Sequence, residues 1–196
     1  MLGIKGYKPN FSTNASEFIG KHKTDLRHLI GKQINCYYLQ WETNENTWNE
    51  DGVIILEIDK VQYEFTAFKL DEFSLTISEI NLSEKLDWYG AENEMPLIWK
   101  KNPIEEINVC LNKAIEEIYI LEHSMTLGTE GDSEKKEFFK QLTKSEFFII
   151  GVEFKLEGVE NCLQLSNGLD CNVIKIETTK VDNKNRRIKI EKKRKR

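Results

Sequence analysis

The chain has 196 residues, of which 39% are hydrophobic and 31% are charged, with a formal net charge of −5. This balance fits one globular domain or two small, tightly joined ones with a sizeable core. The first residues contain no apolar run of signal-peptide length, and no later stretch is long enough to span a membrane. The composition therefore predicts a cytoplasmic protein without a membrane segment.

The charge is unevenly distributed along the chain. Residues 180–196 contain 10 Lys or Arg and 2 acids, a net charge of +8, whereas residues 1–179 contain 18 basic and 31 acidic residues, a net charge of −13. An acidic body with a basic tail affects the choice of partners more than the fold.

An N-terminal leader and helix (residues 1–23) precede the first predicted repeat, residues 24–82. Thr24 or Asp25 can cap a short helix with Leu26, Leu29 and Ile30 on its apolar face, and the segment from Ser16 extends or precedes it. Gly31 ends that helix. Four alternating apolar stretches then predict an antiparallel meander; they read "INCYYLQWE", "GVIILEI", "YEFTAF" and "FSLTISEI".

The connector, residues 83–102, is rich in tryptophan and precedes the second predicted repeat, residues 103–179. Asn102 as N-cap, Pro103 at the first helical position and Glu105 predict a capped helix that ends at Asn112. Strand patterns follow at "IEEIYILEH", "FFIIGVEFKL", "NCLQL" and "NVIKIE". Within this half, residues 124–146 predict an inserted loop and short helix that Ser133 can cap, with Phe138, Phe139 and Leu142 facing inward.

Residues 180–196 predict a basic edge strand followed by a free tail. Ile188 and Ile190 alternate with polar residues after a turn at "DNKN", and the Lys and Arg residues would discourage edge-to-edge association. The alternative is that the whole segment is disordered.

The two halves resemble each other at an offset of 81 residues at their start and of 99 residues near their end, because the second half contains the insertion. "LIGKQINCYYL" at 29–39 aligns with "CLNKAIEEIYI" at 110–120, so that Gly31 matches Asn112, the two residue types that best tolerate a left-handed helix end. Near the ends of the halves, "KLDEFSLTI" aligns with "GLDCNVIKI". We therefore predict an α+β fold: a tandem duplication of a helix followed by a four-stranded, mostly antiparallel meander, with the halves packed in pseudo-two-fold symmetry.

No motif for catalysis or cofactor binding is present. The chain lacks GxSxG, GxxxxGK[ST], GxGxxG and HExxH, and its three histidines (His22, His28, His123) are explained as surface residues. The four cysteines (Cys36, Cys110, Cys162, Cys171) have no CxxC spacing and are predicted to be free thiols. We expect no catalytic residue, no cofactor and no metal site.

Carboxylates and all four tryptophans gather in "WETNENTWNED" (41–51) and "DWYGAENEMPLIW" (87–99). Packing of Trp88 and Trp99 explains part of this pattern. Trp48, in a polar acidic loop, is less easily explained as core and is a candidate contact for a protein partner. The candidate binding residues, near a seam between the two halves, are Trp48, Glu50, Asp51, Asp87, Trp88, Tyr89 and Glu94.

Three functions remain open on this reading. The first is a non-catalytic protein-interaction module, of the adaptor or immunity type, whose acidic surface binds a basic protein partner. The second is a small-molecule binder or enzyme with its site at the seam, with His123 as a further candidate. The third is nucleic-acid association through the basic tail, which the net charge of the body disfavours. The sequence does not define the oligomeric state.

Overall fold

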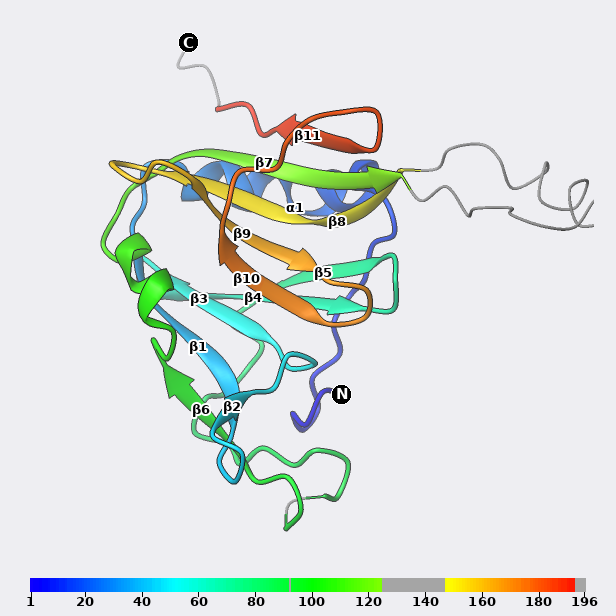
Figure 1. The fold of residues 1–196 in the computed structure, drawn as a ribbon, viewed down its shortest axis with the longest axis vertical. Coiled ribbons are helices and arrows are strands. Elements are labelled where there is room, and N and C mark those ends of the chain that lie inside the picture. The colour runs from blue at the N-terminus through cyan, green and yellow to red at the C-terminus, as the bar shows by residue number, and fades with distance from the viewer. Residues whose placement is uncertain (92, 125–146, 193–196) are drawn as a thin grey trace, which may run out of the picture.

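The structure is a computed structural model, which describes residues 1–91, 93–124 and 147–192. These residues form one α-helix, one 3-10 helix and two antiparallel sheets (Figure 1). The predicted insertion at residues 124–146, with Ser133, Phe138, Phe139 and Leu142, lies outside the described residues apart from its first position. None of the described helices is both long and apolar enough to cross a membrane.

The α-helix, α1 (Ala15–Leu29), is one continuous helix, so the segment from Ser16 extends the predicted first-repeat helix. Asn14 is its N-cap, because the Asn14 side chain accepts a hydrogen bond from the Glu17 N–H at 2.9 Å. Thr24 and Asp25 therefore lie inside one continuous helix and cap nothing, and the leader and first-repeat helices are the same element. Phe18, Leu26 and Leu29 are buried; they recur at helical spacing and face the core.

The first sheet contains six strands, which follow the order β2-β1-β3-β4-β5, with β6 also paired with β1. All of its pairings are antiparallel. The strands are β1 (Ile34–Glu42), β2 (Thr47–Trp48), β3 (Ile54–Ile58), β4 (Val61–Phe68), β5 (Glu72–Ile77) and β6 (Leu97–Lys101).

The second sheet contains five strands in the order β10-β9-β8-β7-β11, again antiparallel throughout. Strand β11 lies at its edge beside β7, at the opposite end of the molecule from β2 and the connector (Figure 1). The strands are β7 (Ile115–Ser124), β8 (Phe147–Leu156), β9 (Cys162–Asn167), β10 (Asn172–Ile176) and β11 (Asn185–Lys189).

The second half contains no α-helix at the predicted place. Residues Glu105–Cys110 form a single 3-10 helix, η1, whose N-cap is Ile104 and lacks a side-chain capping bond. Asn102 has a φ of 49° and pairs with β1: its N–H donates to the Tyr37 carbonyl, and its Oδ1 accepts from the Tyr37 N–H. The capping-box prediction is wrong here because the sheet uses the polar groups that a cap would need.

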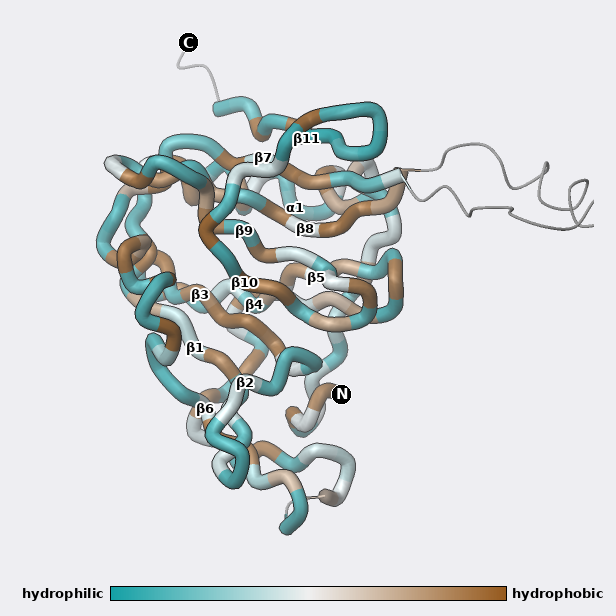
Figure 2. The backbone as a smooth tube through the Cα atoms, viewed as in Figure 1, coloured by the Kyte–Doolittle hydropathy of each residue, from teal (hydrophilic) through white to brown (hydrophobic). Residues whose placement is uncertain are grey.

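The main core lies between the two sheets and beneath α1. Phe65 of β4 meets Phe154 of β8 edge to face, with ring centroids 6.0 Å apart, and both side chains are fully buried. Phe18 of α1 contacts Phe73 of β5 in the same cluster. Figure 2 shows hydrophobic stretches along β3 and β8 and hydrophilic residues in the hairpin that joins β1 and β2. Apolar burial from both sheets and α1 thus stabilises one joint core.

A second core covers the outer face of the first sheet. Leu2, Ile4 and Tyr7 from the N-terminal segment pack there with residues of β3 and of the connector. Trp88 and Trp99 are partly buried against this cluster, as expected if they pack the connector onto the sheet. The earlier part of the connector, with Leu86 and Trp88, is therefore held over the first sheet, whereas Leu97–Lys101 of the connector form β6, a strand of that sheet that was not predicted.

The two meanders share several local details. Strand β1 has a bulge between Ile34 and Cys36, and β7 has one between Ile115 and Glu117, at the same offset of 81 residues. Gly31 and Asn112 both have positive φ, 93° and 59°, so the sequence correctly predicts two left-handed residues. Their backbone bonds are reciprocal, since the Gly31 N–H donates to the Ile115 carbonyl and the Asn112 N–H to the Ile34 carbonyl, at 2.8 and 2.7 Å.

A carboxylate is buried beneath the second core. Glu64 is fully buried, and its side chain accepts hydrogen bonds from the Thr76 hydroxyl (2.7 Å) and from the Glu79 and Ile80 N–H groups (2.9 and 3.3 Å). The Tyr7 hydroxyl lies 3.0 Å from Thr76 Oγ1. Burial raises the pKa of Glu64, although these hydrogen bonds oppose the shift.

We expect Glu64→Gln to gain stability relative to the wild-type protein as the pH rises from 4 to 7. The pKa of Glu64 is higher in the folded state than in the unfolded state. The wild-type side chain therefore contributes fully to stability below the unfolded pKa, about 4.3, and this contribution is lost as the pH rises through the folded pKa. Glutamine does not titrate. Urea unfolding of both proteins at several pH values measures the difference, and a constant or falling difference would contradict the prediction.

Strand β11 is held by its basic side chains. Arg187 forms an ion pair with the fully buried Glu153, with 2.8 Å between Nη2 and Oε2, and its guanidinium lies 3.9 Å from the centre of the Tyr119 ring. Lys189 pairs with Glu117. Two cations of the basic segment are therefore engaged with carboxylates of the body.

Candidate functional site

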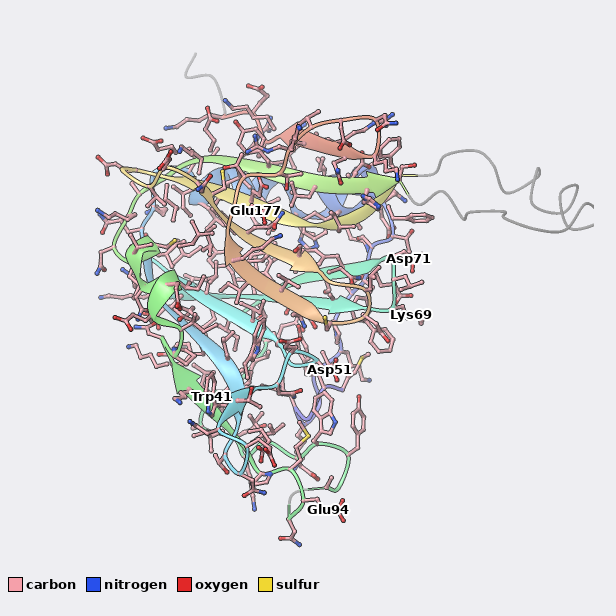
Figure 3. The ribbon with its side chains drawn as sticks, in the orientation of Figure 1. Trp41, Asp51, Lys69, Asp71, Glu94 and Glu177 are labelled. Carbon is pink, nitrogen blue, oxygen red and sulfur yellow. The ribbon has the colours of Figure 1, made fainter. Side chains whose placement is uncertain are left out.

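A hollow of about 560 Å³ lies where the first sheet, the connector and the β9–β10 turn meet; we call it the acidic hollow. Its lining contains five carboxylates and no Lys, Arg or His. Figure 3 shows Asp51 on the loop before β3 and Glu94 near the lower end of the connector. The lining residues are Glu42, Glu45, Thr47, Trp48, Asn49, Glu50, Asp51, Glu94, Met95 and Cys171.

The β1–β2 hairpin forms one wall of the acidic hollow. Trp41 and Trp48 are paired across the hairpin, and the Glu42 carboxylate accepts the N–H groups of Asn44 and Glu45, which closes the turn. Trp48 is half-buried and packs against the main core. The prediction that Trp48 lies outside the core is therefore only partly correct, because one part of the indole packs inward while the residue still lines the hollow.

The loop that carries Glu50 and Asp51 is anchored by buried amides. Asn49 Nδ2 donates to Gln40 Oε1 at 3.1 Å, and a Cβ at Gly52 would come within 2.6 Å of the same oxygen. From the second sheet, Asn172 donates through Nδ2 to the carbonyls of Gly52 and Glu50, at 2.6 and 3.1 Å. The loop is thus fixed from both sheets, and its two acidic side chains remain exposed at the hollow.

A smaller hollow of about 220 Å³ adjoins the first; we call it the aromatic hollow. Asp51 lines both hollows. The rings of Trp88 and Tyr89 meet edge to face with centroids 5.2 Å apart. The lining residues are Leu2, Asp51, Ala67, Phe68, Trp88, Tyr89 and Asp170.

A tight turn presents Tyr89 at this hollow. The Asp87 carboxylate accepts the Gly90 N–H at 2.8 Å, and Tyr89 itself has a φ of 53°, which is rare for a bulky residue. The Tyr89 hydroxyl accepts a hydrogen bond from the Leu2 N–H at 3.4 Å. Asp87 therefore holds the turn in place and lines neither of the two hollows.

The carboxylates perturb their neighbours at the point where the hollows meet. Burial raises the pKa of Asp51, and the nearby Asp170 carboxylate raises it further. Burial also raises the pKa of the Cys171 thiol, followed by the charges of Glu50, Asp51 and Asp170. Burial opposes a charge of either sign, but the contributions of the neighbouring carboxylates show a negative potential here, which favours a positively charged ligand.

The structure brings most of the predicted binding residues to the two hollows. Trp48, Glu50, Asp51 and Glu94 line the acidic hollow, whereas Trp88 and Tyr89 line the aromatic hollow with Asp51. Glu42 and Glu45, in the same acidic segment, were not among the predicted binding residues, and neither were Asp170 and Cys171, which the β9–β10 turn adds. Asp170 and Cys171 could not have been predicted from a local pattern, because they lie far from residue 51 along the chain.

The histidines lie away from both hollows. His123 Nδ1 is 2.9 Å from Asn185 Oδ1 between β7 and β11, and His22 packs against Phe18, where burial lowers its pKa. His28 is exposed on α1. Within residues 1–91, 93–124 and 147–192, no group of three or more His, Cys, Asp or Glu side chains is arranged to hold a metal ion.

A comparison of the chain with protein-family models, with curated proteins and with solved structures finds no significant match.

Proposed function

We propose that the chain is a non-catalytic protein-interaction module that binds a basic segment of a partner protein in the acidic hollow. The observation that carries the proposal is the lining, in which Glu42, Glu45, Glu50, Asp51 and Glu94 occur without a Lys, Arg or His. An uncompensated group of carboxylates around a concave surface attracts cations and increases the rate at which a basic partner associates.

Apolar groups at the same place add contact area to this attraction. Trp48, Met95 and Cys171 lie in the lining among the carboxylates. Tryptophan is enriched among the residues that contribute most to protein interfaces, and methionine adapts to irregular surfaces. The combination suits a segment with Lys or Arg residues and short apolar side chains better than it suits a polyanion.

A cytoplasmic location fits this proposal. The four cysteines are free thiols, and three of them, Cys36, Cys110 and Cys162, are buried. Free thiols of this kind are usual in a reducing compartment.

We also infer that the two halves arose by tandem duplication and that they are related by a pseudo-two-fold axis. Support comes from the matching meanders, from the bulges after Ile34 and Ile115, and from the reciprocal bonds of Gly31 and Asn112. The helices are the divergent part, since α1 has 15 residues and η1 has 6. On this view the acidic hollow lies at the seam between the halves, where binding sites are common.

The test is a titration of the ¹⁵N-labelled protein with a hexalysine peptide, followed by NMR. We expect saturable shifts at residues 42–51, 94–95 and 171, with an affinity that falls as salt is added. The double variant Glu50→Gln/Asp51→Asn removes two exposed charges and should weaken binding by about fivefold.

The matched control is Glu157→Gln/Glu160→Gln, which removes the same charge from the exposed β8–β9 turn, away from the lower end of the molecule (Figure 1). This control should bind hexalysine within about twofold of the wild-type affinity. Equal losses in both double variants would show that net charge alone attracts the peptide, and the proposed site would be rejected.

A further inference from the structure

The aromatic hollow combines two aromatic rings with two carboxylates, one of which, Asp51, it shares with the acidic hollow. Trp88 and Tyr89 come from the connector, Asp51 from the loop before β3, and Asp170 from the β9–β10 turn. Together with Leu2 near the N-terminus and the end of β4 at Ala67 and Phe68, five chain segments distant in sequence converge on one small volume. Nothing in the core packing requires Tyr89 there, because its side chain is 70% exposed.

The two carboxylates lack a positive partner among the described residues. Neither Asp51 nor Asp170 forms an ion pair with a described Lys or Arg, and the nearby Lys69 ammonium instead pairs with Glu72 at 2.9 Å. Asp170 Oδ1 accepts only a backbone bond, from the Lys69 N–H at 2.6 Å. Figure 3 shows the Lys69 side chain on the β4–β5 turn, apart from Asp51. The negative charge at this hollow is therefore not neutralised by an ion pair, although the Lys69 ammonium attracts Asp170 at longer range.

We propose that the aromatic hollow binds a single alkylammonium group, the side chain of a lysine in the basic segment, between the Trp88 and Tyr89 rings and the carboxylates of Asp51 and Asp170. An ammonium ion is attracted both by the faces of aromatic rings and by carboxylates, whereas a neutral ligand gains from neither. The volume of about 220 Å³ is below the range of ordinary small-molecule pockets, about 300–1,000 Å³, and suits the end of one side chain.

This inference rests on the proposed function for its natural ligand, although its chemistry can be measured separately. The probe is Nα-acetyl-lysine methylamide, and its neutral counterpart carries an acetyl group on Nζ. Followed by NMR, the cationic probe should give saturable shifts of the Trp88 indole N–H and the Tyr89 ring. The neutral probe should give no saturable shift there, because acetylation removes the charge.

Single variants distinguish the contribution of the aromatic rings to probe binding from that of the carboxylates. Tyr89→Leu should weaken the cationic probe by about threefold, whereas Tyr89→Phe, which keeps the ring, should bind like the wild-type protein. Asp170→Asn keeps an oxygen for the Lys69 N–H and lines only the aromatic hollow; it should also weaken the probe by about threefold. Glu157→Gln, an exposed carboxylate that lines neither hollow, is the control and should leave the probe affinity unchanged.

Several outcomes would overturn the inference: equal binding of the two probes, equal losses in Tyr89→Leu and Tyr89→Phe, or wild-type affinity in Asp170→Asn. Its failure is distinguishable from that of the proposed function. If hexalysine binds at residues 42–51 while the Tyr89 and Asp170 variants bind the peptide normally, only the lysine pocket is rejected. If the cationic probe binds and hexalysine does not, the ammonium site stands and the basic-segment proposal is rejected.

Discussion

Arg187→Met is expected to lower the free energy of unfolding by about 3 kcal/mol, because it leaves the fully buried Glu153 carboxylate without its counter-charge. Broken buried ion pairs cost about 3–5 kcal/mol, and the lower end applies because the Arg187 side chain is 18% exposed. The variant also loses the contact of the guanidinium with Tyr119. Urea unfolding at pH 7 measures the change.

The double variant Glu153→Gln/Arg187→Met provides the control. It removes both charges, while the glutamine can still accept the Thr179 N–H that Glu153 Oε1 accepts at 2.6 Å. We expect it to be more stable than Arg187→Met alone, so that the two substitutions are not additive. If the double variant instead shows the sum of the two single losses, the ion pair does not account for the attachment of β11.

Asn172→Ala is expected to cost about 3 kcal/mol or more, because it removes the side-chain partner of the buried Ala67 N–H and of the Gly52 carbonyl, whereas the Glu50 carbonyl keeps its bond from the backbone N–H of residue 172. Asn172 is 1% exposed, its Oδ1 accepts the Ala67 N–H at 2.7 Å, and its Nδ2 donates to the carbonyls of Glu50 and Gly52. Each unsatisfied buried group costs about 1–3 kcal/mol. Urea unfolding measures the loss, and faster hydrogen exchange of the Ala67 amide would locate it.

The matched control for this substitution is Asn167→Ala. The Asn167 side chain also bonds across the two sheets, since Nδ2 donates to the Lys69 carbonyl at 2.7 Å, but the residue is half-buried. Water can replace its lost bonds, so the expected loss is about 1 kcal/mol. Equal losses at Asn167 and Asn172 would show that burial of the amide does not matter, contrary to the argument.

The strands were more predictable from the sequence than the helices. Alternation of apolar and polar residues located four strands in each half but not β2 or β6, and the steric preference of Gly31 and Asn112 located two left-handed turns. Helix starts were not predictable in this way, because a cap depends on which backbone N–H groups are free. Asn14 caps α1 because its side chain accepts the Glu17 N–H, whereas Asn102 caps no helix because its polar groups are bonded to Tyr37.

The candidate site was predictable only in part, for a related reason. The acidic and aromatic residues of 41–51 and 87–99 are visible as local clusters, and both clusters reach the hollows. Asp170 and Cys171 join them through the second sheet. Asp87 is visible in the same cluster, yet its carboxylate bonds the Gly90 N–H and shapes a turn instead of lining either hollow.

The sequence by itself determined most of the strands, two of the turns with positive φ, and where charge accumulates, because periodicity, backbone sterics and charge are properties of neighbouring residues. Only the tertiary structure decided that the two sheets share one core, that Arg187 forms an ion pair with Glu153, and that Asp51 and Asp170 line the same hollow as Tyr89. These contacts join residues far apart in the chain. They depend on how whole surfaces pack, and no local pattern records that packing.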